Sequence, residues 1–227
     1  MATVAEVMDE LSALGTAQNV KIYRRHGAGE NVFGVSYADL GKLKRRLKVD
    51  HALARALWHT GNHDARVLAT MIADPAQMTE AELDAWIDDV DCHALATAVA
   101  TDVASRMPGA KERLERWIES DAEWRGRAGW HLAAWLAMHD PSLPDAFCER
   151  LLETIEARIH TGKNRVRDAM NDALIAIGGR TPALRERATA AARRIGKVEV
   201  DHGETGCKTP DAASYIDKIW ARRQARK

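Results

Sequence analysis

Basic side chains that could bind phosphate groups are gathered at several places along the chain. They are Lys42, Lys44, Arg45, Arg46 and Lys48, then Arg125 and Arg127, then Lys163, Arg165 and Arg167, then Arg193, Arg194 and Lys197. Contacts from such residues to a nucleic-acid backbone would be independent of base sequence and sensitive to salt. Lys163 and Arg165 are also expected near a helix N-terminus, where backbone amides favour phosphate. The alternative is an ordinary solvated surface balanced by acids such as Glu80 and Glu153, and composition alone favours that alternative.

The segment HGETGCKTP at residues 202–210 brings together a histidine, an acid and a cysteine, which are residue types that can bind a metal ion. Its single ligands are irregularly spaced, however, and Cys92, Cys148 and Cys207 stand far apart without a C-x-x-C pair. This pattern favours reduced thiols over a disulfide framework or a zinc site. We therefore expect no metal and no cofactor, and we interpret residues 196–208 as a structured turn that packs the last helix.

Helices are the elements that would position these side chains. In residues 51–72 apolar side chains recur at helical spacing, and Asp74-Pro75 ends the pattern because proline cannot continue a helix. The motif Thr79-x-x-Glu82 resembles a capping box and precedes a second apolar stripe, Leu83, Trp86, Ile87 and Val90. This stretch predicts a packed helical hairpin.

The same idea recurs along the rest of the chain. Further N-terminal signals are predicted at Thr3-x-x-Glu6, Ser36-x-x-Asp39, Ser120-x-x-Glu123, Thr181-Pro182 and Thr209-Pro210. No segment shows convincing strand alternation, so the sequence predicts roughly a dozen helices joined by short turns. The expected fold class is all-α: an α-solenoid of HEAT-like antiparallel helix pairs, with units of about 40 residues and a curved concave face for binding. We expect one such domain over residues 1–227.

Composition limits the classes of function. With 227 residues, 46% hydrophobic and 29% charged, the chain is typical of a folded protein rather than a disordered one. Its 33 basic and 33 acidic residues give no net charge, so any nucleic-acid surface requires basic residues to segregate onto one face. The N-terminus MATVAEVMDE does not resemble a signal peptide, and no apolar run is long enough to span a bilayer. We expect a cytoplasmic protein that does not bind membranes.

Three stretches carry a resemblance to a known family. GVSYADLGKLKRRLK, ALWHTGNHDARVLATMIADP and LDAWIDDVD resemble the AlkD-like DNA alkylation-repair family, and NRVRDAMNDALIAIGG through KVEVDHGETGCKTPDAASYI is similar to a longer branch of it. The resemblance runs from about Asn31 to Ile216, leaving a basic C-terminal tail over residues 217–227. It implies a HEAT-like solenoid that holds duplex DNA in a basic groove. In active members it also implies hydrolysis of the N-glycosidic bond of cationic alkylpurines.

The resemblance places four family site positions on this chain. The family's Trp corresponds to His93, its catalytic Asp to Thr97, its Arg to Arg127 and its second Trp to Asp172. His93 and Thr97 keep the i, i+4 spacing that puts both on one helix face. Only Arg127 is retained, and a threonine hydroxyl cannot offer a full negative charge to a cationic sugar. The fold is therefore expected to transfer more readily than the activity.

Two carboxylates could substitute for the missing Asp. They are Asp172 and Asp91, and each has a structural alternative: Asp172 could pair with a nearby Arg, and Asp91 could cap the following helix. His93 could likewise be a hydrogen-bonded structural residue. Most of the seven tryptophans lie at apolar stripes and are expected in the core, while Trp130 is a candidate platform facing DNA.

Three functional hypotheses follow. The protein is an alkylpurine DNA glycosylase with a displaced carboxylate, a DNA-binding member that recognises lesions or unusual duplex structure without cutting, or a HEAT-like protein-interaction scaffold. Given the resemblance, lining of a DNA groove becomes the favoured interpretation of the basic residues. The expected DNA-binding set is Lys42, Lys44, Arg45, Arg125, Arg127, Lys163, Arg165, Arg167 and Trp130. Loss of the Trp–Asp pair favours the second hypothesis, with double-stranded DNA as partner and the protein as a monomer.

Overall fold

The computed structural model describes residues 2–225, which form two compact units. Unit 1 comprises the chain up to Ala110 together with Gly203–Thr205, and unit 2 comprises Lys111–His202 and the chain from Gly206 onward. Each unit has its own apolar core built from helices. Within residues 2–225 no strand is present and no helix is long and apolar enough to cross a bilayer.

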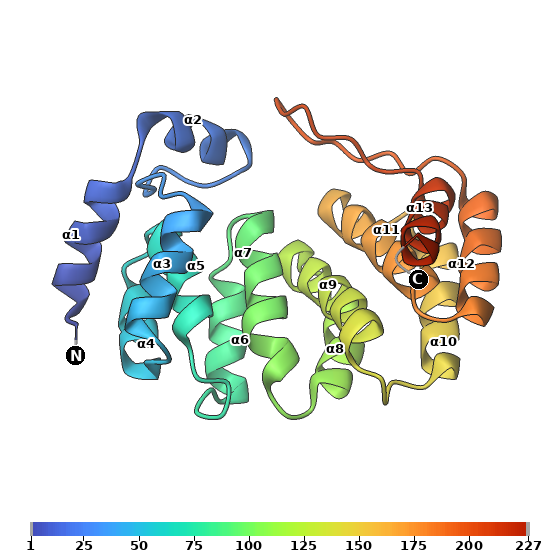
Figure 1. Cartoon of the computed structure of the whole chain (residues 1–227), viewed down its shortest axis with the longest axis horizontal. Coiled ribbons are helices and arrows are strands. Elements are labelled where there is room, and N and C mark those ends of the chain that lie inside the picture. Colours follow the sequence, from blue (N-terminus) through green and yellow to red (C-terminus); the bar gives the residue numbers. More distant parts are fainter. Residues whose placement is uncertain (1, 226–227) are drawn as a thin grey trace. The chain divides into compact units, whose positions relative to one another are not determined.

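Unit 1 is made of short helices joined by short turns (Figure 1). They are α1 (Val4–Leu14), α2 (Ala17–Arg25), α3 (Tyr37–Leu47), α4 (His51–His59), α5 (His63–Ile72), α6 (Glu80–Asp88) and α7 (His93–Ala98). The last of these continues as a π-helical segment over Val99–Val103 and a short 3-10 turn over Ala104–Arg106. The first helical pattern of the predicted hairpin, residues 51–72, is two helices, α4 and α5, because the chain turns at Gly61, whose φ is 67°. The second pattern of that hairpin is α6.

The predicted helix starts in unit 1 are mostly confirmed. Thr3 and Glu6 form a complete capping box at α1, and the Ser36 hydroxyl accepts the Asp39 amide at α3. At α6 only half of the predicted box forms: the Thr79 hydroxyl accepts the Glu82 amide. The Glu82 carboxylate turns to α4, where it lies 3.3 Å from His51 Nε2 and 3.1 Å from Arg55 Nε.

The core of unit 1 contains two of the expected buried tryptophans. The rings of Trp58 and Trp86 stack 4.3 Å apart and nearly parallel, joining α4 to α6. Trp58 Nε1 donates a hydrogen bond to Asp89 at 3.2 Å. The buried Asp64 of α5 accepts the amides of Phe33, Gly34 and Val35, which fixes the loop before α3.

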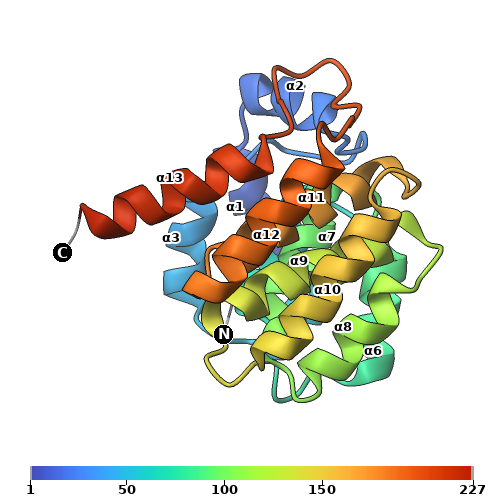
Figure 2. The same ribbon diagram turned by 90° about the vertical axis from the view of Figure 1, so that its right-hand side faces the viewer.

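Unit 2 contains longer helices. They are α8 (Ala110–Ile118), α9 (Glu123–His139), α10 (Asp145–Arg158), α11 (Asn164–Gly178), α12 (Pro182–Ile195) and α13 (Ala212–Gln224). Helices α8, α10 and α12 lie side by side (Figure 2), and α9 packs along α11 (Figure 1). Gly126 and Gly129 let α9 approach its neighbours closely, because a Cβ on Gly129 would lie 2.8 Å from the Ile118 amide nitrogen.

One predicted boundary of unit 2, the start of α9, was wrong in detail. The predicted cap at Ser120 does not form: α9 begins at Glu123, its N-cap is Ala122, and the Ser120 hydroxyl accepts only the Ala122 amide. The basic residues of the expected tail, residues 217–227, lie at the end of the last helix, since α13 continues to Gln224. Lys227 and its neighbour at 226 lie outside the described residues.

The segment of residues 196–211 has no helix, as predicted. It is anchored on α11 rather than only on the last helix. Asn164 exchanges two hydrogen bonds of 2.7 Å with the backbone of Asp201, and Asn171 donates to the Pro210 carbonyl. Two asparagines about two helical turns apart on α11 therefore hold both arms of this segment.

Candidate nucleic-acid interface

Helix α7 carries two of the four family site positions, His93 and Thr97. The helix begins at His93, its N-cap is Cys92, and no side chain caps it. The expected structural role of Asp91 as the cap was therefore wrong; Asp91 is exposed one residue before the N-cap.

The Thr97 hydroxyl is bound to its own helix. It donates to the His93 carbonyl at 3.0 Å, Thr101 donates to Thr97 in the same way, and Ser105 donates to Thr101 at 2.7 Å. Such i−4 hydrogen bonds locally distort helices, and here the π-helical segment Val99–Val103 falls within the ladder. Position 97 offers neither a negative charge nor a free hydroxyl proton to a substrate.

Asp102, in the π-helical segment, was not singled out from the sequence. Burial raises the pKa of its carboxyl, while Arg106, Lys44 and a hydrogen bond from the Thr70 side chain act to lower it. π-helical turns are frequent at functional sites. The sequence contained one indication of this residue: Asp102 is an acid one residue before the buried Val103, within an otherwise apolar stripe.

Arg127, the one retained family residue, is buried between α9 and α11. Its side chain is 6% exposed, and its Nη1 donates to Asp168 Oδ2 at 2.7 Å and to the Arg165 carbonyl at 3.0 Å. The expectation that Arg127 contacts DNA directly was wrong, because close packing of α9 on α11 encloses the guanidinium and the carboxylate of Asp168 pairs it.

Asp172 lies one helical turn beyond Asp168 on α11. Burial raises the pKa of its carboxyl to about 6, and the charge of Asp168 adds to this, while Arg127 lowers it. No described residue donates a hydrogen bond to Asp172, so the predicted alternative of an ion pair with a nearby arginine does not form: Arg127, whose charge acts on Asp172, is paired with Asp168. The structure thus brings together Arg127 and Asp172, with Asp168 as a third member that the sequence did not indicate.

Trp130 does not face solvent. Its side chain is fully buried in α9, like those of Trp58, Trp86 and Trp117. The expectation of a DNA-facing platform at Trp130 was therefore wrong, because α9 is buried on most of its surface and not only on one stripe.

The remaining basic candidates differ in whether their charged groups already have a partner within the protein. Lys42 pairs with Asp39 at 2.7 Å, and Lys163 Nζ donates to the Asp121 carbonyl at 2.6 Å. The Arg165 amide donates to Glu123 at 2.7 Å, so a carboxylate already occupies the predicted phosphate position at the start of α11. Among the DNA-binding candidates, Arg45, Arg165 and Arg167 form no ion pair with a described residue.

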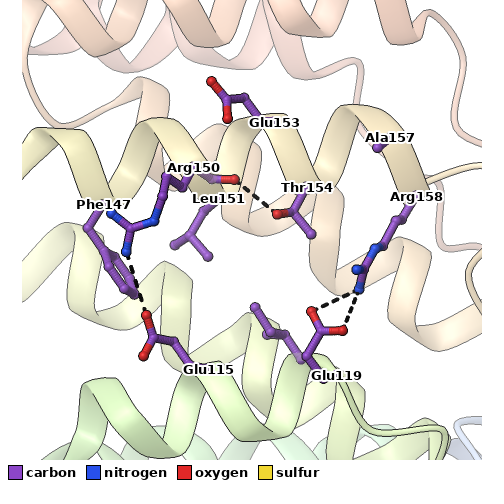
Figure 3. Close-up of a pocket in the computed structure, with 10 residues that line it drawn as sticks. Glu115, Glu119, Phe147, Arg150, Leu151, Glu153, Thr154, Ala157 and Arg158 are labelled. Atoms are coloured by element: carbon purple, nitrogen blue, oxygen red, sulfur yellow. Dashed lines mark hydrogen bonds and ion pairs between the residues drawn. The ribbon is translucent and has the colours of Figure 1, made fainter.

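One groove of unit 2 has the size of a ligand site but is not a phosphate site. It lies between α8 and α10, has a volume of about 560 Å³, and is bridged by ion pairs (Figure 3). Arg158 lies 2.8 Å from Glu119, and Arg150 lies 3.6 Å from Glu115. Because each cation faces an acid, the groove presents no net positive surface.

Metal ligation is not evident in the described part of the chain. Within residues 2–225 no three His, Cys, Asp or Glu side chains are placed to share an ion. In the 202–210 segment, His202 lies 3.0 Å from the Thr209 hydroxyl, and Cys207 is exposed and forms no disulfide with a described residue.

Comparison with known proteins agrees with this architecture. Residues 7–216 match the family described as DNA alkylation repair enzyme. The chain belongs to that family. Two uncharacterized relatives, from Listeria monocytogenes and Listeria innocua, are 33% and 32% identical over 223 residues, covering 96% of this chain and 97% of each relative.

A solved structure extends the comparison to the fold. It is described as a new family of proteins related to the HEAT-like repeat DNA glycosylases with affinity for branched DNA structures. It superposes with a TM-score of 0.91 at 32% identity, covering 98% of this chain and 95% of that chain. The predicted family and the all-α, HEAT-like class of the fold are both confirmed.

Proposed function

We propose that this protein binds branched DNA by contacting the sugar–phosphate backbone of the DNA, and that it does not hydrolyse glycosidic bonds. The observation that carries the proposal is the state of Thr97. At the family's carboxylate position stands a neutral hydroxyl, and its proton is already donated to the His93 carbonyl. Stabilising an oxocarbenium-like sugar requires a negative charge placed beside it, and α7 does not supply one at this position.

DNA binding is supported by the family and by the similar solved structure, which is described as having affinity for branched DNA. Within unit 2, Arg165 and Arg167 lie two positions apart in the first turn of α11, and neither forms an ion pair with a described residue. Guanidinium groups of this kind suit phosphate oxygens, which they contact through two parallel N–H groups.

A second candidate function, removal of alkylated purines, is favoured by one observation. Asp172 is a half-buried carboxylate with a pKa of about 6 and no hydrogen bond from a described residue. Carboxylates perturbed in this way gather at catalytic sites. Asp172 is therefore the residue through which base excision would operate if the protein performs it.

The test has two parts. Electrophoretic binding compares a four-way junction with a linear duplex of the same total length, and we expect the junction to bind at least about tenfold more tightly, which is about 1.4 kcal/mol. Release of methylated purines from alkylated DNA is then measured under single-turnover conditions, and we expect none above a protein-free control.

Three results would change the conclusion. Release that disappears in Asp172→Asn but persists in the exposed control Asp91→Asn would establish the second candidate. Equal affinity for junction and duplex would remove the preference for branched DNA. Absence of binding to either DNA at low salt would leave a HEAT-like protein-interaction scaffold.

A further inference from the structure

Unit 1 contains a small pocket that the family positions do not explain. It lies where α2 and the loop after it meet the first residues of α3, α5 and α7, and its volume is about 240 Å³. Six of its lining residues are Ile22, Tyr23, His26, Tyr37, His63 and His93. Of the four family positions only His93 contributes to it.

The wall of the pocket is formed by the aromatic rings of tyrosine and histidine side chains. The rings of Tyr23 and Tyr37 lie 6.4 Å apart edge to face, and Tyr23 lies 5.7 Å from the ring of His63. His26 and His93 form a second edge-to-face pair at 5.6 Å. Tyr37 is 51% exposed and Ile22 is 36% exposed, so large apolar surface at the rim remains in contact with water.

The pocket contains three histidines, His26, His63 and His93, and one thiol, but no side chain that is always charged at pH 7. Neither an acid nor a lysine or arginine lines it. Burial lowers the pKa of His63 and raises the pKa of the Cys92 thiol to about 11, so both side chains are neutral near pH 7. Cys92 Sγ lies 3.7 Å from His63 Nδ1, but a protonated thiol is a weak nucleophile, so Cys92 is poorly suited to covalent chemistry.

The volume of the pocket and the chemistry of its lining residues together indicate the kind of ligand that it binds. Pockets for drug-sized ligands are typically about 300–1,000 Å³, so this one suits a single flat ring system. Aromatic walls bind nucleobases by stacking, independently of base identity. The Tyr37 hydroxyl forms no hydrogen bond with a described residue, so it remains able to pair with a heteroatom at the edge of a base.

We propose that this pocket accepts one unpaired nucleobase from a DNA strand bound to the protein. The proposal rests on the proposed function, since it requires DNA to be bound. It explains why a protein of this kind would favour branched DNA: junctions expose bases that a linear duplex keeps stacked and paired, and capture of such a base costs less unstacking.

The test compares two DNA junctions that differ only in the presence of one nucleobase. Each carries one unpaired nucleotide, which is either adenine or an abasic tetrahydrofuran with the same phosphates. We expect the wild-type protein to bind the adenine junction at least about fivefold more tightly, since base–aromatic stacking contributes on the order of 1 kcal/mol or more per base. Backbone contacts are the same in both DNAs, so they cancel in this ratio.

Ala94→Leu fills the pocket from α7 and should reduce the ratio below about twofold without weakening binding to the abasic junction. Ala38→Leu, at an exposed position of α3, is the matched control and should keep the wild-type ratio. At the exposed rim, Tyr37→Ala should lose most of the preference for adenine, and Tyr37→Phe should keep it. Because Tyr37 is exposed, these two variants test the pocket even if Ala94→Leu fails to fold.

The outcomes separate the two proposals. Tight binding to both junctions with no preference for adenine overturns the pocket but leaves DNA binding intact. A preference that survives in both Ala94→Leu and Tyr37→Ala also overturns it, since the base is then recognised elsewhere. Failure to bind either junction overturns the proposed function and this inference together.

Discussion

Asp172 is a carboxyl group in surroundings that disfavour its charged form. Its carboxyl is half-buried, lies near a second acid and receives no hydrogen bond from a described residue, and these conditions raise its pKa to about 6. A native-state pKa above the unfolded value of 3.8 means that the unfolded state ionises first as pH rises. Stability contributed by the neutral carboxyl is therefore present below about pH 4 and lost by about pH 6.

Asp172→Asn should consequently stabilise the protein at neutral pH. A rise from 3.8 to about 6 corresponds to about 3 kcal/mol in full, at about 1.4 kcal/mol per pH unit. Because the group is only partly buried, we expect a gain of about 1–3 kcal/mol at pH 7.5 and little gain near pH 4. Urea denaturation across this pH range measures it.

Asp168→Asn is the matched control, because it should destabilise the protein at pH 7.5. It removes the partner of the buried Arg127, which then lacks its ion pair. A gain from Asp172→Asn that is the same at pH 4 and pH 7.5 would show that ionisation of Asp172 is not its cause.

At the scale of elements, close contact between helices depends on glycine at one position and not at another. A Cβ on Gly129 of α9 would lie 2.8–2.9 Å from backbone and side-chain atoms of α8. At Gly41 of α3, the nearest atom is the flexible end of Arg45, at 3.9 Å. The same substitution should thus have opposite effects at these two helical sites.

Gly129→Ala should lower the free energy of unfolding by about 1–3 kcal/mol, because α8 and α9 must separate. Gly41→Ala should raise it by about 0.5–1 kcal/mol, because alanine loses less backbone entropy on folding. Thermal or urea unfolding checks both, with far-UV circular dichroism to verify helix content. Two changes of the same sign would contradict the packing described for α9.

The pattern of elements was largely accessible from sequence, since helix starts and stripes depend on neighbouring residues. The caps at Thr3, Ser36 and Thr181 were predicted from a single residue or a short motif and are present. The cap at Ser120 was not, because the chain makes one further turn before α9 begins. The π-helical segment in α7 was also missed, since its apolar stripe does not differ visibly from that of an α-helix.

At the scale of the whole molecule, 33 basic residues are balanced by 33 acidic ones. Many of the basic residues already pair within the protein, as Arg187 does with Glu149 and Arg194 with Glu156. Only cations without such partners can replace counterions on DNA at low cost. A neutral protein that binds DNA should therefore do so with few phosphate contacts.

We accordingly expect a shallow salt dependence, with a slope of log K on log salt concentration of about −2 to −4. Arg165→Gln and Arg167→Gln should each reduce its magnitude by about 1. Arg187→Gln, which removes an exposed but paired arginine, should leave it unchanged. Fluorescence anisotropy over a salt series measures the slope, and a value near −8 would mean that internal ion pairs open on binding.

The sequence by itself determined the all-α class, the family and most helix boundaries, because these depend on local spacing and on motifs read along the chain. Its one-domain organisation over residues 1–227 stays a prediction. Only the tertiary structure decided which side chains are available. Arg127 and Asp168 are 41 residues apart, Trp130 is enclosed on all sides, and the ring-lined pocket draws on four helices. Burial and pairing of this kind depend on which helix faces meet, and periodicity within one helix does not specify that.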